Sequence, residues 1–99
     1  MITELAILYI REGQQQHFES DFAKAGKFIG SIKGYAGHSL HKCIEHDNKY
    51  MLLVKWDKIE DHTIEFRQSA VYQQWKELLH HYYDPFPVVE HYGTILMNK

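Results

Sequence analysis

Histidine is the residue type in this sequence best suited to chemistry, with eight in 99 residues. An imidazole titrates near neutral pH, so it can transfer protons or bind metals. The spacing does not favour a metal site. His38 and His41 are three apart on a predicted strand and point to opposite faces, and His80 and His81 are adjacent on a predicted helix, roughly 100° apart. There is no H-E-x-x-H motif, and a single cysteine, Cys43, cannot form a zinc knuckle. We therefore expect no metal site.

His62 is the histidine with the most informative surroundings. It lies in "WDKIEDHTIEF", residues 56–66, which is typical of a strand end followed by a helix. Asp57 and Glu60 have the spacing of a capping box. Helical spacing places His62 on one face with Ile59, Thr63 and Phe66. The pattern alone favours a structural histidine that bonds Asp61, Glu65 or a strand carbonyl. The alternative is a base that takes a proton from a phenol or enol.

Aromatic residues on both sides of His62 could line a pocket. Trp56 ends the preceding strand, Phe66 shares the face of His62, and Tyr72 and Trp75 share the inward face of the next helical piece. If the helix is broken at Ser69, it can bow away from the sheet and leave an aromatic cavity with a few polar groups, the usual composition of a small-molecule site. The other interpretation is a filled core.

The end of the chain offers one further polar candidate. Glu90 and His91 alternate on the last predicted strand, so one of them faces inward or into an interface. We include His91 among the candidate substrate-binding residues. An interface hydrogen bond is the alternative role.

The elements that must position these residues follow from hydrophobic periodicity. Strands are predicted at residues 4–10, about 36–45, about 50–56 and 88–97. The first helix starts at residue 14 and carries a stripe from Phe18 to Ile32, with Gly34 as its stop. The second helical region is broken in two by Ser69 and ended by "DPFP". The order is β-α-β-β-α-β, a ferredoxin-like α+β domain over residues 1–99 with a four-stranded antiparallel sheet.

Two of the predicted strands are apolar on both faces, as strands of a doubly covered sheet are. Two helices can cover only one face of a four-stranded sheet. We therefore predict a homodimer in which the second faces pack together.

Composition excludes several function classes. The formal net charge is −2 and the charges are scattered, so no nucleic-acid-binding surface is indicated. The N-terminal "MITELAILYIREG" has neither a basic region nor a cleavage site typical of a signal peptide. No apolar run is long enough to span a membrane. We expect a cytoplasmic location.

The segment "YMLLVKWDKIEDHTIEFRQSAVYQQWKELLHHYYDPFPVVEHY" resembles the antibiotic-biosynthesis monooxygenase-like domains of the dimeric α+β barrel superfamily. The front half, with "REG", Phe18, Phe22 and "GYAGHSL", is similar too. The resemblance implies a homodimeric barrel with one pocket in each subunit. It further implies oxidation of aromatic phenols or quinols by O₂ without metal or flavin.

By this resemblance His62 is the candidate base, and the pocket walls are Trp56, Phe66, Tyr72 and Trp75. Haem-degrading relatives carry an iron-ligating histidine near the position of Lys76, so haem binding would need His80 or His81 instead. Three functions are thus predicted, in this order: a cofactor-independent monooxygenase acting on a small aromatic, a non-catalytic dimeric binding module, and a haem-binding or haem-degrading protein.

Overall fold

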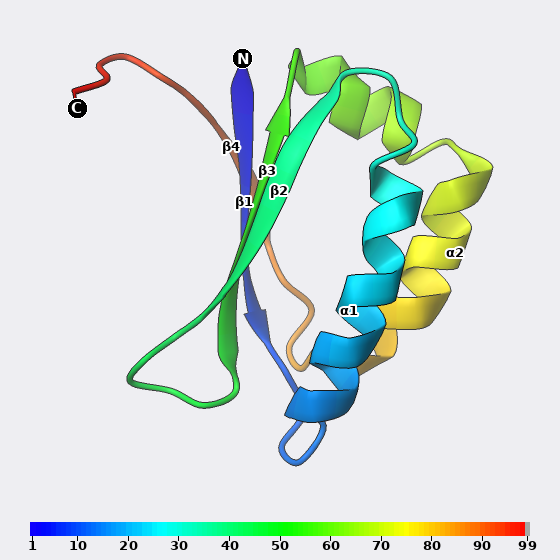
Figure 1. The fold of residues 1–99 in the computed structure, drawn as a ribbon, viewed down its shortest axis with the longest axis vertical. Coiled ribbons are helices and arrows are strands. Elements are labelled where there is room, and N and C mark those ends of the chain that lie inside the picture. The colour runs from blue at the N-terminus through cyan, green and yellow to red at the C-terminus, as the bar shows by residue number, and fades with distance from the viewer. Residues whose placement is uncertain (99) are drawn as a thin grey trace.

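The fold is a four-stranded antiparallel sheet with helices on one face (Figure 1). The computed structural model describes residues 1–98. The elements follow the predicted β-α-β-β-α-β order, and the sheet order is β2-β3-β1-β4. Their bounds are β1 Ile2–Tyr9, α1 Gln15–Ile29, β2 Tyr35–Lys42, β3 Lys49–Trp56, the π-helical η1 Asp61–Phe66, α2 Ala70–Leu79, the 3₁₀ turn η2 His80–Tyr82, and β4 Val89–Gly93.

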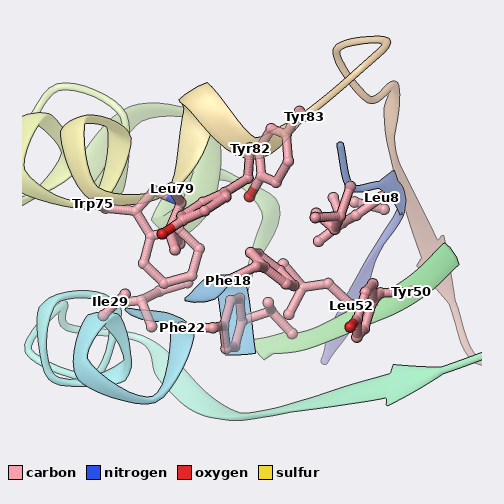
Figure 2. Close-up of a cluster of buried hydrophobic side chains, with 14 of the residues drawn as sticks. Leu8, Phe18, Phe22, Ile29, Tyr50, Leu52, Trp75, Leu79, Tyr82 and Tyr83 are labelled. Atoms are coloured by element: carbon pink, nitrogen blue, oxygen red, sulfur yellow. The ribbon is translucent and has the colours of Figure 1, made fainter. Parts of the chain in front are cut away.

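The core lies between the sheet and the two helices (Figure 2). Phe18, Phe22 and Ile29 of α1 point toward the sheet, as the stripe at spacings of three and four predicts. Trp75 and Leu79 of α2 meet them from the other helix. Phe22 and Trp75 pack edge to face with ring centroids 5.5 Å apart, which joins the helices.

Within residues 1–98, helices cover one face of the sheet and leave the other open. On β1, Glu4, Ala6 and Leu8 are buried, whereas Leu5 and Ile7 on the opposite face are only half-buried. The other apolar face predicted for β1 therefore exists but has no covering layer within residues 1–98. In the same described range, no helix is long and apolar enough to cross a membrane.

Several predicted boundaries were wrong. Helix α1 ends at Ile29 rather than near Gly34, because Gly30 caps it and a tight turn follows. The last strand stops at Gly93, since the following residues leave the sheet. The break at Ser69 is confirmed: its hydroxyl accepts the Tyr72 N–H at 3.2 Å and caps α2.

The predicted capping box is absent, and a different contact begins the segment. The N-cap of η1 is Glu60, without a side-chain bond. Instead, the buried Asp61 carboxylate accepts the backbone N–H of Lys58 at 3.1 Å. This carboxylate lies against Gly34, where φ is +92° and an added Cβ would come within 2.1 Å of Asp61 Oδ2. Gly34 also accepts the Asp57 N–H through its carbonyl at 2.8 Å. These contacts fix η1 against the start of β2.

Gly34→Ala should therefore destabilise the fold more than Gly37→Ala. Both glycines have positive φ, but among residues 1–98 no atom outside its immediate neighbours lies within 4 Å of a Cβ at Gly37. Gly37→Ala should cost about 1–3 kcal/mol of backbone strain. Gly34→Ala should cost roughly a further 1–3 kcal/mol from the collision with Asp61. Urea unfolding of both variants measures the difference, and equal losses would show that the Asp61 contact does not constrain Gly34.

Candidate functional site

A buried carboxyl group is the centre of the candidate site. Glu4 lies on the helix-facing side of β1, between the sheet and η1, and is only 5% exposed. Its Oε1 accepts the indole N–H of Trp56 at 2.9 Å. The two residues are diagonal neighbours on the same face, because Glu4 pairs with Val54 and Ile2 pairs with Trp56. The Trp56 side chain can therefore reach across the strands to Glu4.

His62 completes the contact from the other side. Its Nε2 is 3.4 Å from Glu4 Oε1, and its Nδ1 is 2.7 Å from Nε2 of His91. The ring stacks on Trp56 with centroids 5.4 Å apart and planes at 18°. The predicted structural partners of His62 (Asp61, Glu65 or a strand carbonyl) were wrong. The observed partners come from β1 and β4.

The π-helical geometry of η1 gives His62 this direction. The Arg67 N–H donates to the His62 carbonyl five residues back, at 3.2 Å. His62 and Phe66 both face inward and are buried, while Ile59 on the predicted shared face is exposed. One wider turn thus places an imidazole and a phenyl ring side by side, with centroids 6.2 Å apart.

Burial is the largest influence on the pKa values of Glu4, His62 and His91. Desolvation lowers the pKa of His62 to about 3, with smaller contributions from the positive charge of Arg67 and from His91. The pKa of Glu4 is raised by desolvation, which the hydrogen bond from Trp56 and the charge of Arg67 partly oppose. The pKa of His91 is lowered, first by desolvation and then by Arg67. His62 is therefore a neutral imidazole at neutral pH.

A cavity of about 370 Å³ opens next to this cluster. Its floor is the helix-facing side of the sheet, and its walls come from η1, α2 and the segment that follows α2. The size falls in the range of small-molecule sites. The lining residues are Glu4, Ala6, Leu8, Ile29, Leu52, His62, Phe66, Arg67, Tyr72, Trp75, His80, Tyr83, Phe86, Pro87 and Val89.

The aromatic wall consists of Phe66, Tyr72 and Trp75. Phe66 meets Tyr72 with centroids 5.1 Å apart and Trp75 with centroids 5.7 Å apart, both nearly edge to face. These three predicted pocket residues and His62 all line the cavity. The break at Ser69 therefore separates η1 from α2 far enough to leave open space between them and the sheet.

Two predicted pocket residues, Trp56 and His91, are not among the residues that line the cavity but pack behind them. Trp56 is fully buried, and its indole N–H is used by Glu4 rather than offered to a ligand. His91 meets the site through its contact with His62. The register explains its direction: His91 pairs with Glu4, so both side chains lie on the helix-facing side of the sheet.

Sequence reasoning missed Glu4, Arg67 and Tyr83 as lining residues and named His80 only as a haem ligand. Glu4 carried a usable signal, because it takes the position of a core residue in register with Ala6 and Leu8 on an apolar strand. The other three gave no such signal. Arg67 lies just past η1, and the turn that brings His80 and Tyr83 to the cavity has no helical or strand periodicity.

No group of three or more histidine, cysteine, aspartate or glutamate side chains within residues 1–98 is arranged to hold a metal ion. Glu4, His62 and His91 are close, but they contact one another in a row rather than converging on one point.

Comparison with known proteins identifies the family. The sequence profile described as "Antibiotic biosynthesis monooxygenase" (ABM) matches residues 1–78. The chain belongs to the ABM family. It is 53% identical over 95 residues to the uncharacterised protein YczJ of Bacillus subtilis (strain 168), an alignment that covers 96% of this chain and all of YczJ.

Solved structures agree with this assignment. A Bordetella bronchiseptica protein provisionally described as an antibiotic biosynthesis monooxygenase has a TM-score of 0.92 and 33% identity, with 96% of this chain and 97% of that one covered. SnoaB, a cofactor-independent oxygenase from Streptomyces nogalater, has a TM-score of 0.75 and 19% identity over 98% of this chain and 94% of SnoaB. The similarity to SnoaB shows a shared ABM fold.

The depressed pKa of His62 predicts a specific pH dependence of stability. The pKa of His62 is near 3 in the folded protein, against 6.5 for an ordinary imidazole. Below pH 6.5 the unfolded chain therefore binds a proton that the folded protein does not bind, so the free energy of unfolding falls as the pH falls toward 3. Between pH 6.5 and about pH 5, the wild type should lose about 1–2 kcal/mol relative to His62→Gln. The raised pKa of Glu4 acts in the opposite direction, but it is present in both proteins.

Urea unfolding of wild type and His62→Gln across this pH range measures the effect. The matched control is His17→Gln, at an exposed position on α1. Its curve should run parallel to that of the wild type. Parallel curves for His62→Gln as well would contradict a neutral, buried His62.

Proposed function

We propose that this protein is a cofactor-independent monooxygenase that oxidises a small phenol or quinol with O₂. One observation carries the proposal: the cavity joins an aromatic wall of Phe66, Tyr72 and Trp75 to the buried polar cluster of Glu4 and His62. The walls suit a flat aromatic ring, and the cluster suits the hydroxyl proton. Membership of the ABM family supports the same reaction class.

The reaction needs no group beyond the substrate, O₂ and a site for the proton. Loss of the hydroxyl proton gives a phenolate, which transfers one electron to O₂. The phenoxyl radical and superoxide then combine at a ring carbon, and the resulting peroxide takes back one proton as it loses water, which leaves a quinone. Overall, a phenol with a free para position and O₂ give a quinone and H₂O. The protein's part is to ionise the phenol and to keep the radical pair together in an apolar cavity.

Residues of the site have distinct proposed roles in this scheme. Phe66, Tyr72 and Trp75 hold the ring. His62, which the family resemblance makes the candidate base, contacts Glu4 and handles the proton together with it. Arg67 lines the same cavity, and its positive charge favours an anion there. Trp56 and His91 support Glu4 and His62 from behind the cavity wall.

Oxygen consumption with a panel of quinols and hydroxyanthraquinones tests the proposal. The wild type should consume O₂ faster than buffer with at least one member. His62→Ala should lower kcat by about 10²–10⁴-fold, the usual contribution of a group that assists proton transfer. His17→Ala, the exposed control, should leave the rate unchanged. If no substrate is oxidised above the buffer rate, but the protein still binds a phenol, a non-catalytic binding module is the better description.

A haem-binding function is the second candidate, because His80 lines the cavity. Its pKa is lowered by burial and by the charge of Lys76, so the ring is in the neutral form that binds iron. His81 instead contacts the Leu78 carbonyl at 3.1 Å and is exposed. A Soret shift on haem titration that His80→Ala abolishes would favour this function over the monooxygenase.

We further propose a homodimer that packs the open face of the sheet against the same face of a second copy. Leu5, Ile7, Met51 and Leu53 give this face an apolar, half-buried centre. A symmetric interface of this kind would convert the two sheets into a barrel. The helices lie on the other side of the sheet (Figure 1), as does the cavity, which is lined by helix-facing residues and would remain open to solvent.

Leu53→Glu should convert the dimer to a monomer, because it places a charge at the centre of the proposed interface without a partner. Light scattering and sedimentation at matched concentrations give the mass. Ile64→Glu is the control, since Ile64 is an exposed apolar residue of η1 on the helix side of the molecule. A wild-type monomer, or a dimer that survives Leu53→Glu, would rule out this interface.

A further inference from the structure

Glu4 is an unusual residue for its position. A carboxyl group on the covered side of a sheet costs free energy unless other groups satisfy it. Both interactions recorded for it within residues 1–98, with the Trp56 indole and with the His62 ring, involve Oε1. The residue also lines the cavity. Glu4 is thus held from behind through one oxygen and borders the space where a ligand would lie.

The contacts continue from Glu4 to the edge of the sheet. His62 Nε2 is 3.4 Å from Glu4 Oε1, and His62 Nδ1 is 2.7 Å from His91 Nε2. His91 is on β4, the edge strand next to β1, and is partly exposed. The three side chains therefore form a continuous row from the cavity wall, through the buried His62 ring, to a residue that solvent can reach.

We propose that Glu4 accepts the hydroxyl proton of the phenolic ligand, and that His62 and His91 pass this proton to solvent. This inference rests on the proposed function, since it assumes a phenolic ligand in the cavity. It differs from the sequence prediction in one respect: His62 does not take the proton from the substrate directly. Glu4 is the catalytic acid–base group, and His62 and His91 act through it.

The transfer balances without a charged imidazole. The phenol O–H bond breaks as an O–H bond forms on the Glu4 carboxylate, which leaves a phenolate and a neutral acid. Glu4 then gives its proton to His62 Nε2 while His62 Nδ1–H is transferred to His91 Nε2. His91 releases a proton to water, and one proton returns along the same row when the peroxide later loses water, so the overall reaction releases no proton. Because burial strongly disfavours a cationic His62, gain at one nitrogen must accompany loss at the other.

The surrounding charges suit Glu4 to this step. The groups that face it are Trp56 from β3, His62 from η1, His91 from β4, Arg67 after η1 and Tyr83 after η2. Burial raises the pKa of Glu4, which makes its carboxylate a stronger base than an exposed one. The positive charge of Arg67 lowers this pKa and so favours the ionised carboxylate, which is the form that can accept a proton. Burial raises the pKa of Tyr83, and the charge of Glu4 adds to this effect.

The competing explanation is that Glu4 only anchors Trp56. Glu4→Gln separates the two roles, because the amide oxygen can still accept the indole N–H but cannot take up a proton. Glu65→Gln is the matched control: it removes a carboxylate from η1 at an exposed position. Urea unfolding first confirms that each variant is folded.

Proton uptake on binding 4-nitrophenol is the primary measurement, because it requires no turnover. At a pH above the pKa of the free phenol, calorimetry in buffers of different ionisation enthalpy gives the protons taken up per probe bound. The wild type and Glu65→Gln should take up about one proton per probe bound, shared between the phenolate and Glu4. Glu4→Gln should take up about none. Equal uptake in wild type and Glu4→Gln would overturn the proposal and leave the proposed function intact. A wild type that does not bind the probe would contradict both.

Oxygen consumption tests the later steps with any quinol that the wild type oxidises. His91→Gln should keep the proton uptake on binding but lower kcat at least tenfold, because release of the proton to solvent is interrupted. An unchanged kcat would rule out the path through His91. Glu4→Asp keeps the carboxyl but withdraws it by one methylene, so uptake should persist with a lower kcat. An unchanged kcat in Glu4→Asp would contradict direct contact between Glu4 and the substrate.

Discussion

The structure around the cavity depends on one interaction, the burial of the Glu4 carboxyl between Trp56 and His62. A carboxyl group on the covered face of β1 needs polar partners, and both come from outside its own strand. Trp56 can supply one only if β1 and β3 keep their register, and His62 only if η1 lies across the end of the sheet. Strand pairing, the direction of η1 and the position of His91 on β4 are all tied to this single group.

Much of the fold followed from the sequence because hydrophobic periodicity is a strong local signal. The stripe through Phe18, Phe22 and Ile29 predicts the inner face of α1, and Ser69 marks the start of α2. Two predicted signals failed where a tertiary contact overrode a local pattern. Gly34 is required by the approach of the Asp61 carboxylate and not by the end of a helix. The predicted capping box of Asp57 and Glu60 does not form; instead the same Asp61 carboxylate accepts the Lys58 N–H at the start of the segment.

The site was only partly predictable, for a related reason. Phe66, Tyr72 and Trp75 share helical faces, so spacing alone brings them to one cavity. The pairing of Glu4 with His62 spans 58 positions of the chain and leaves no periodic trace. Trp56 was expected among the cavity walls because it is aromatic and close, yet its one donor satisfies Glu4, and the ring fills the space behind. Partners distant in sequence decide which aromatic residues line a cavity and which support it.

The π-helical turn of η1 ties the approach of His62 toward Glu4 to the length of this segment. The bond from the Arg67 N–H to the His62 carbonyl spans five residues, where an α-helix would span four. Removal of any one of residues 63–65 would restore α-helical spacing and leave His62 and Phe66 three positions apart, which is still one face of a helix. Such a deletion would therefore change the width of the turn and not the face that carries the two rings. A homologue with one residue fewer here would keep both rings on the inner face, but its histidine would approach Glu4 from a tighter turn.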